Sequence, residues 1–169
     1  LFVNCGIRRS ELVNLNLSDV YEDRIRVIGK GNKERFVYFG SACRKAIDAY
    51  LPERNQKVLT DNRALFGSRD NNRISVTAVH RLVKKALLQA GLDSTQYSAH
   101  KLRHTAATMM LSGGVDVKTV QEVLGHENLN TTQIYTHIES TELKIAAEAN
   151  PLSKLDFSDK MEDNNDSNQ

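Results

Sequence analysis

The chain has 169 residues, of which 40% are hydrophobic and 26% are charged, and its formal net charge at pH 7 is +2. This balance is typical of one folded globular domain, and the sequence lacks the run of about 20 apolar residues that a membrane-spanning helix needs. The chain opens inside an apolar pattern, with neither an initiating Met nor a signal peptide, so we expect it to be part of a longer protein.

The charges are distributed unevenly along the chain. From residue 156 onward Lys160 is the only basic residue, and without this acidic end the net charge is about +6. A basic body is compatible with a polyanionic partner, although many proteins of other function have the same balance. We expect residues 151–169, which are polar and acidic, to be a disordered tail that follows a domain at residues 1–150.

The first predicted elements are a short helix and a β-hairpin. Residues 9–17 place Leu12 and Leu15 on one side of a helix, which turn-prone residues then end. Residues 24–28 and 35–39 are rich in β-branched and aromatic side chains, which is typical of strands. The segment between the strands contains two glycines, so it predicts a hairpin with Lys30 at its tip.

Helices dominate the rest of the chain. We expect one at residues 41–51, ended by Pro52, and a loop-rich stretch at residues 53–72. Apolar residues then recur at the helical period from Val76 to Ala90, with Ser75 as the N-cap.

The other face of this helix is basic, with His80, Arg81, Lys84 and Lys85. The charge pattern alone leaves open whether this face contacts phosphates or is simply solvated. We include Arg81, Lys84 and Lys85 among the candidate DNA-binding residues.

Two further helices are predicted from their capping residues. Ser98 begins one that runs through Leu111, and Asp116 begins another that ends at Leu124, before Gly125. A final pair is expected at residues 131–137 and 141–149. The prediction is a mainly helical domain with one small antiparallel sheet.

Cys5 and Cys43 lie far apart in the sequence and show no metal-ligand spacing. We expect both to be buried and reduced, which suits a cytoplasmic protein because disulfides are rare in that compartment.

Three clusters carry candidate chemistry. They are residues 6–12 (GIRRSEL), residues 98–104 (SAHKLRH), and residues 124–126 (LGH) with Tyr135 nine positions later. His100 and Arg103 are three apart, so a helix presents both on one face. His100 and His104 also have a zinc-ligand spacing, but Lys101 replaces the Glu of the HExxH motif and Arg103 adds a fixed cation, so we predict no metal.

Together these clusters resemble the tyrosine site-specific recombinases, the family of the bacterial Xer proteins and the phage and transposon integrases. The resemblance covers residues 6–12, the hairpin at 29–35 (GKGNKER), residues 100–104, and residues 124–126 with 131–137 (TTQIYTH). It implies a catalytic domain that is mainly helical (α+β) with a small three-stranded antiparallel β-sheet. The upstream DNA-binding domain of the family and the opening helices of its catalytic domain are missing here, so we expect weak DNA binding.

The resemblance also implies a role for each site residue. Arg8, Arg103 and His126 donate hydrogen bonds to the phosphate, where charge develops in the transition state. Tyr135 is the nucleophile; a free phenol has a pKa of about 10 and needs a proton acceptor, which is His100. Lys30 is the general acid for the leaving 5′ oxygen.

The remaining implications concern support and assembly. Glu11 can orient Arg8 from one turn away, although a plain surface ion pair is an alternative. His104 and His137 are supporting residues. No cofactor is expected, and the implied partners are a double-stranded DNA recombination site and further copies of the protein, in a tetramer that exchanges residues 141–149.

Two other functions fit parts of the pattern. A type IB topoisomerase would use the same phosphotyrosine without exchanging strands. A DNA-binding or directionality protein would keep the fold and lack catalysis, and the complete catalytic set argues against it. The sequence therefore predicts site-specific DNA recombination, by cleavage and rejoining through a 3′-phosphotyrosyl intermediate.

Overall fold

The computed structural model describes residues 1–93, 95–125, 145 and 147–150. Within these residues the α-helices are α1 (Phe2–Cys5), α2 (Arg9–Asn14), α3 (Ser41–Gln56), α4 (Val76–Gln89), α5 (Ala99–Ser112) and α6 (Val117–Leu124). None of the described helices is long and apolar enough to cross a bilayer.

The sheet is a β-hairpin. Strand β1 (Arg24–Ile28) pairs antiparallel with β2 (Glu34–Tyr38), in a register that runs from Arg24 opposite Tyr38 to Ile28 opposite Glu34. A 3₁₀ turn (Lys30–Asn32) closes the hairpin, and Gly31 takes a positive φ of 71° in it. The predicted place of Lys30 at the hairpin tip is confirmed.

The family resemblance predicts a sheet of three strands. This prediction is wrong for the described part of the chain, whose sheet has two strands. The segment before β1 makes only an isolated bridge, from Val20 to Ile25. A 3₁₀ helix (Leu17–Asp19) precedes this segment, and the Tyr21 N–H donates to the Arg24 carbonyl at 2.9 Å. The turn therefore leaves too few extended residues for a strand.

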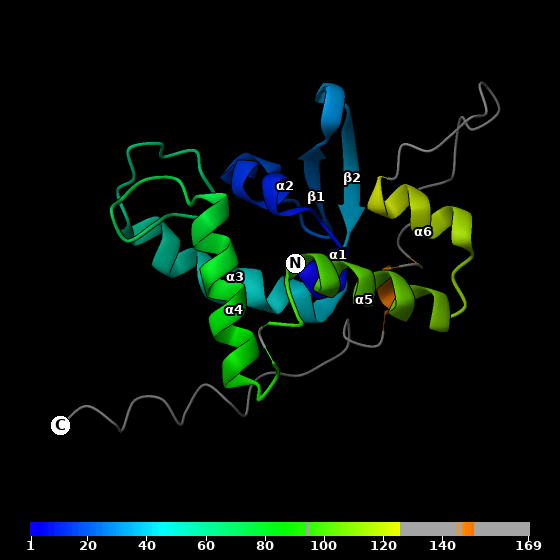
Figure 1. Ribbon diagram of the computed structural model, residues 1–169. Coiled ribbons are helices and arrows are strands. Elements are labelled where there is room, and N and C mark those ends of the chain that lie inside the picture. Colours follow the sequence, from blue (N-terminus) through cyan, green and yellow to red (C-terminus); the bar gives the residue numbers. More distant parts are fainter. Residues whose placement is uncertain (94, 126–144, 146, 151–169) are drawn as a thin grey trace.

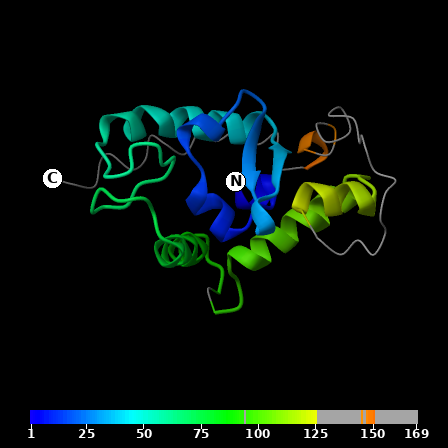
Figure 2. The same cartoon turned by 90° about the horizontal axis from the view of Figure 1, so that it is seen from above.

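The hairpin stands between α2 and α6, and α1 lies at its base against α5 (Figure 1). The inward side chains of the hairpin, Ile25, Val27 and Val37, are buried. Seen from above, α3 lies on one side of the molecule, and α4 and α5 lie on the other (Figure 2). The core joins these elements, and its largest fully buried apolar side chains are Ile7, Leu15, Ile25, Leu65 and Met110.

The predicted helix starts from α4 onward are confirmed by their caps. Ser75 accepts from the Ala78 N–H, Ser98 from that of Lys101, and Asp116 from those of Lys118 and Thr119. Val79, Val83 and Leu87 on the apolar face of α4 are buried, as the periodicity predicted, whereas Val76 and Leu82 of the same pattern are exposed.

Two predicted helix ends are wrong, in opposite directions. Helix α2 ends at Asn14 rather than near residue 17, because the backbone at Leu15 and Leu17 bonds to the loop that follows α3. Helix α3 continues through Pro52 to Gln56. Its last turn holds the buried Arg54, which donates to three carbonyls of the following residues, and these bonds stabilise the extra turn.

Cys5 and Cys43, distant in the sequence, are both free and buried. A hydrogen bond with Cys43, together with burial, raises the pKa of Cys5 well above its ordinary value. The prediction of buried, unbridged thiols is confirmed.

The last described residues pack against the start of the chain. Ala147 and Asn150 are buried, and the Asn150 side-chain amide donates to the Val3 carbonyl at 2.7 Å. The predicted helix at residues 131–137 lies outside the described residues, as does most of the one at 141–149.

Candidate active site

Arg8 occupies the N-cap position of α2, where its side chain is 39% exposed. Glu11, one turn later, is only 3% exposed and bonds Arg8 twice. Its carboxylate accepts from the Arg8 backbone N–H at 2.8 Å and from Arg8 Nη1 at 2.9 Å. This geometry excludes the plain surface ion pair and holds the guanidinium in one orientation.

Arg103, on α5, is the most buried cation among the candidate site residues that the structure describes. Its guanidinium donates to the carbonyls of Gly6 and Leu124, the latter at 2.6 Å. Burial, with the nearby charge of Arg8, lowers the pKa of Arg103 to about 10. Arg103 is therefore still charged at neutral pH, inside a cluster of cations.

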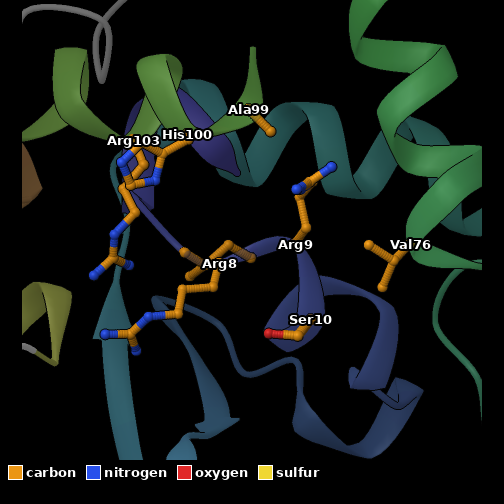
Figure 3. Close-up of a pocket in the computed structure, with 8 residues that line it drawn as sticks. Arg8, Arg9, Ser10, Val76, Ala99, His100 and Arg103 are labelled. Atoms are coloured by element: carbon orange, nitrogen blue, oxygen red, sulfur yellow. The ribbon is translucent and has the colours of Figure 1, made fainter.

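A cavity of about 390 Å³ opens beside these two arginines. Arg8, Arg9, Ser10, His100 and Arg103 supply its polar lining. The side chains of Arg8 and Arg103 extend toward the same side of this pocket, and His100 lies next to Arg103 (Figure 3). Two fixed cations and an imidazole at one pocket can receive a phosphate group.

The hairpin borders a second, larger hollow of about 940 Å³ that shares Arg8 and Ser10 with the first. Lys30, Lys33 and Arg35 line it, together with Gly125 at the end of α6. The structure thus brings Arg8, His100, Arg103 and Lys30 to two adjoining hollows, although they come from three separate parts of the sequence.

The other predicted site residues lie around this centre or outside the description. His104 is exposed on α5, one turn beyond His100, and lines neither hollow. Helix α4 carries Arg81, Lys84 and Lys85. This helix borders the first pocket, because Val76 lines the pocket and His80 Nδ1 lies 3.3 Å from Arg9 Nη1. His126, Tyr135 and His137 lie outside the described residues.

Comparison with known proteins identifies the family. The model of the Phage integrase family matches residues 1–142. The chain belongs to the phage integrase family. This confirms the resemblance to tyrosine recombinases that the sequence motifs carry.

The chain is similar to curated members of the phage integrase family named tyrosine recombinase XerC. It is 55% identical to the XerC of Caldanaerobacter subterraneus subsp. tengcongensis over 155 residues, which cover 91% of the chain and 44% of the relative. It is 46% identical to the XerC of Corynebacterium glutamicum, over 82% of the chain and 44% of the relative. The chain thus spans less than half the length of these relatives.

Solved structures of the family have the same fold. XerA recombinase matches with a TM-score of 0.70 and 38% identity, over 85% of the chain and 53% of that protein. XerH bound to its difH substrate, in a pre-cleavage complex, matches with a TM-score of 0.66 and 30% identity, over 83% of the chain and 42% of that protein.

Two glycines of the family motifs are explained by the site. Gly6, whose carbonyl accepts from Arg103, has a φ of 59°, and a Cβ there would lie 2.4 Å from Leu124 Cδ2. Gly125 has a φ of 64°, and a Cβ there would lie 2.9 Å from Arg35 Cζ. A side chain at residue 6 would therefore clash with Leu124, and one at residue 125 with the Arg35 guanidinium, so both positions require glycine.

Arg35 is the last residue of the hairpin motif at residues 29–35, but the motif does not reveal its role in the site. It bonds both Glu11 and the end of α6. One signal in the sequence could have indicated it: Arg35 alternates with Val37 on the inward face of β2, where a charged side chain needs a partner.

Proposed function

We propose that this chain is the catalytic part of a site-specific DNA recombinase that cuts and rejoins one DNA strand at a time through a phosphotyrosine on Tyr135. The observation that carries the proposal is the convergence of Arg8, Arg103 and His100 on one pocket, beside the hairpin that bears Lys30. These four residues occupy family motif positions, and the chain belongs to the family.

The two arginines bind the scissile phosphate. Charge gathers on the non-bridging oxygens as phosphorus becomes pentacoordinate, and donors already in place stabilise that charge without reorganisation. Arg103 is held by the Gly6 and Leu124 carbonyls, and Arg8 is held by Glu11 and by the Gly125 carbonyl, at 2.8 Å from Arg8 Nη2. Both forks are thus oriented before DNA arrives, and His126 adds a third donor.

In the cleavage step, the phenolic oxygen of Tyr135 forms a bond to phosphorus, and the bond from phosphorus to the 5′ oxygen breaks. His100 takes the phenol proton, and Lys30 gives a proton to the leaving 5′ oxygen. Rejoining is the reverse reaction, in which a 5′ hydroxyl attacks the phosphotyrosine and releases Tyr135. The phosphotyrosyl bond conserves the energy of the phosphodiester, so no nucleotide cofactor is consumed.

Duplex DNA is the proposed substrate, and the exposed face of α4 is part of the surface that binds it. Arg81 and Lys85 are exposed, Lys84 is half-buried, and the helix borders the phosphate pocket through Val76. Cations beside a phosphate site extend the contact along the backbone and make affinity fall steeply with salt. The solved XerH complex with its difH substrate supports duplex DNA as the ligand.

We also propose that four copies assemble on DNA by exchanging residues 141–149. In the free chain, Ala147 and Asn150 dock on the same molecule, through the bond from Asn150 to the Val3 carbonyl. Truncation before Thr141 should leave single-site binding intact and abolish cooperative occupancy of paired sites in a gel-shift titration. Unchanged cooperativity would remove residues 141–149 from assembly.

Covalent trapping tests the catalytic proposal. The probe is a nicked duplex that carries the recombination site of the Caldanaerobacter relative, with the nick a few nucleotides beyond the scissile phosphate. The short strand that bears the new 5′ hydroxyl then diffuses away, and the protein–DNA adduct accumulates. The wild-type chain should form an adduct that survives denaturation and maps to Tyr135.

Tyr135→Phe should form no adduct and bind the duplex with nearly unchanged affinity, because the hydroxyl adds little to docking. Tyr97→Phe is the control, since Tyr97 is an exposed tyrosine outside the family motifs, and it should form adduct at the normal rate. Adduct in Tyr135→Phe, or none with the wild-type chain at saturating duplex, would overturn the proposal.

A further inference from the structure

Arg35 joins the hairpin to the residue that orients Arg8. Its side chain is 17% exposed, and it meets the buried Glu11 carboxylate as a fork, with Nη1 at 2.9 Å from Oε1 and Nη2 at 3.0 Å from Oε2. Arg8 Nη1 bonds the same Oε1. Glu11 therefore lies between two guanidinium groups, one from α2 and one from β2.

The same guanidinium reaches the end of α6. Arg35 Nε donates to the Val123 carbonyl at 3.2 Å, and Nη2 donates to the Leu124 carbonyl at 3.3 Å. The last carbonyls of a helix lack partners within the helix and carry its negative dipole end, so a cation is stabilised there. The hairpin is thereby tied to the point where the chain leaves α6.

Three arginines converge on this point. Arg35 bonds the carbonyls of residues 123 and 124, Arg103 bonds that of residue 124, and Arg8 bonds that of residue 125. His126 follows directly in the sequence. Arg35 therefore bonds Glu11, which orients Arg8, and the end of α6, which Arg103 also bonds. The segment that carries His126 and Tyr135 begins directly after this point in the sequence.

We propose that Arg35 is a positioning residue, which sets the hairpin that carries Lys30 in register with Arg8, through Glu11, and with the end of α6. The inference rests on the proposed function, because it assigns Arg35 to the same cleavage reaction. Arg35 acts through these neighbours and does not touch the reacting atoms. The role requires the planar fork: a lysine has the charge but presents a single nitrogen, which cannot span two carboxylate oxygens and two carbonyls.

The experiment compares Arg35→Lys and Arg35→Met with the same substitutions at Arg26. Arg26 is the matched control because it lies on the same hairpin and also bonds a carboxylate with two nitrogens, at 2.9 and 2.7 Å from Asp19 Oδ1. Each variant of the 169-residue chain is given the nicked duplex described above at saturating concentration. Single-turnover adduct formation, duplex affinity and thermal unfolding are measured for each.

Arg35→Lys should slow adduct formation by about 100-fold, which is the effect expected when reacting groups are misplaced by about 1 Å. Duplex affinity should stay near that of the wild type, and both Arg26 variants should cleave at near-normal rates. The loss should be smaller on a duplex with a bridging 5′ sulfur, because a thiolate leaves without the acid that the hairpin delivers.

Two outcomes would overturn the inference. One is near-normal adduct formation by Arg35→Lys. The other is a loss that is equal on the oxygen and sulfur duplexes and is accompanied by a matching loss of thermal stability, which would make Arg35 purely structural. Both are distinct from failure of the proposed function, in which the wild-type chain itself forms no adduct.

Discussion

Replacement of Glu11 by alanine should destabilise the protein far more than loss of a surface carboxylate. The Glu11 side chain is 3% exposed and accepts four hydrogen bonds of 2.8 to 3.0 Å, two from Arg8 and two from Arg35. Its removal leaves two guanidinium groups close together without their shared anion.

The structure sets the size of the effect. Removal of one partner from a buried ion pair costs about 3–5 kcal/mol, because the other charge is left uncompensated. Arg8 is 39% exposed and Arg35 is 17% exposed, so water screens part of the stranded charge, and we expect about 3 kcal/mol. For a chain of this size, that loss lowers the melting temperature by about 6–12 °C.

Urea unfolding at pH 7 measures the loss, with Glu53→Ala as the control. Glu53 is 67% exposed and pairs with Lys57 at 2.8 Å, so its loss should cost about 0.5 kcal/mol or less. Equal losses in the two variants would refute the reasoning, since they would show that burial and the second arginine add nothing to the Glu11 pair.

The pH dependence gives a second check. Burial opposes ionisation of Glu11, but the bonds from Arg35 and Arg8 outweigh burial, so the pKa of Glu11 lies below its ordinary value. A depressed carboxyl pKa stabilises the fold above the unfolded value of about 4.3, and this contribution is lost as pH falls through the folded pKa. The stability difference between wild type and Glu11→Ala should therefore be constant near neutral pH and shrink below about pH 4.

Three further outcomes are expected. Lys30→Ala should impair cleavage of the 5′-oxygen duplex much more than the bridging 5′-sulfur duplex, and equal losses would mean that Lys30 only positions DNA or the hairpin. Arg8→Ala and Arg103→Ala should each reduce single-turnover cleavage by about 100-fold or more, with a smaller loss of binding; near-normal cleavage would remove that arginine from the phosphate site. Gly125→Ala should cost about 1–2 kcal/mol in urea unfolding, because φ is 64° and the new Cβ would lie 2.9 Å from Arg35 Cζ; unchanged stability would show that the guanidinium moves freely.

The features that the sequence predicts well are those that depend on near neighbours in the chain. Ser75, Ser98 and Asp116 cap helices through backbone N–H groups two or three residues ahead, so the local pattern contains the whole interaction. The hairpin and the position of Lys30 follow from two apolar runs around a glycine turn for the same reason.

Features that depend on distant parts of the chain could not be predicted in this way. Helix α3 passes through Pro52 because Arg54 bonds carbonyls of the loop that follows, and propensity alone does not show those bonds. The role of Arg35 depends on the packing of β2 against both α2 and α6, which only the folded chain establishes. His100 and Arg103 share a helix face as predicted, but their unequal burial depends on where α1 and α6 lie.

The described chain is anchored on both sides of Tyr135, the proposed nucleophile. The Gly125 carbonyl oxygen lies 2.8 Å from Arg8 Nη2. Tyr135 follows Gly125 by ten positions, and ten positions of extended chain span at most about 35 Å. On the other side Ala147 is buried, twelve positions after Tyr135, and twelve positions of extended chain span at most about 42 Å. Arg8 is thus within the length of chain that leads to Tyr135 of the same molecule, and under the proposed function the attack needs no tyrosine borrowed from a neighbour. In that case the first-order rate constant for adduct formation on saturated single sites will not change with protein concentration.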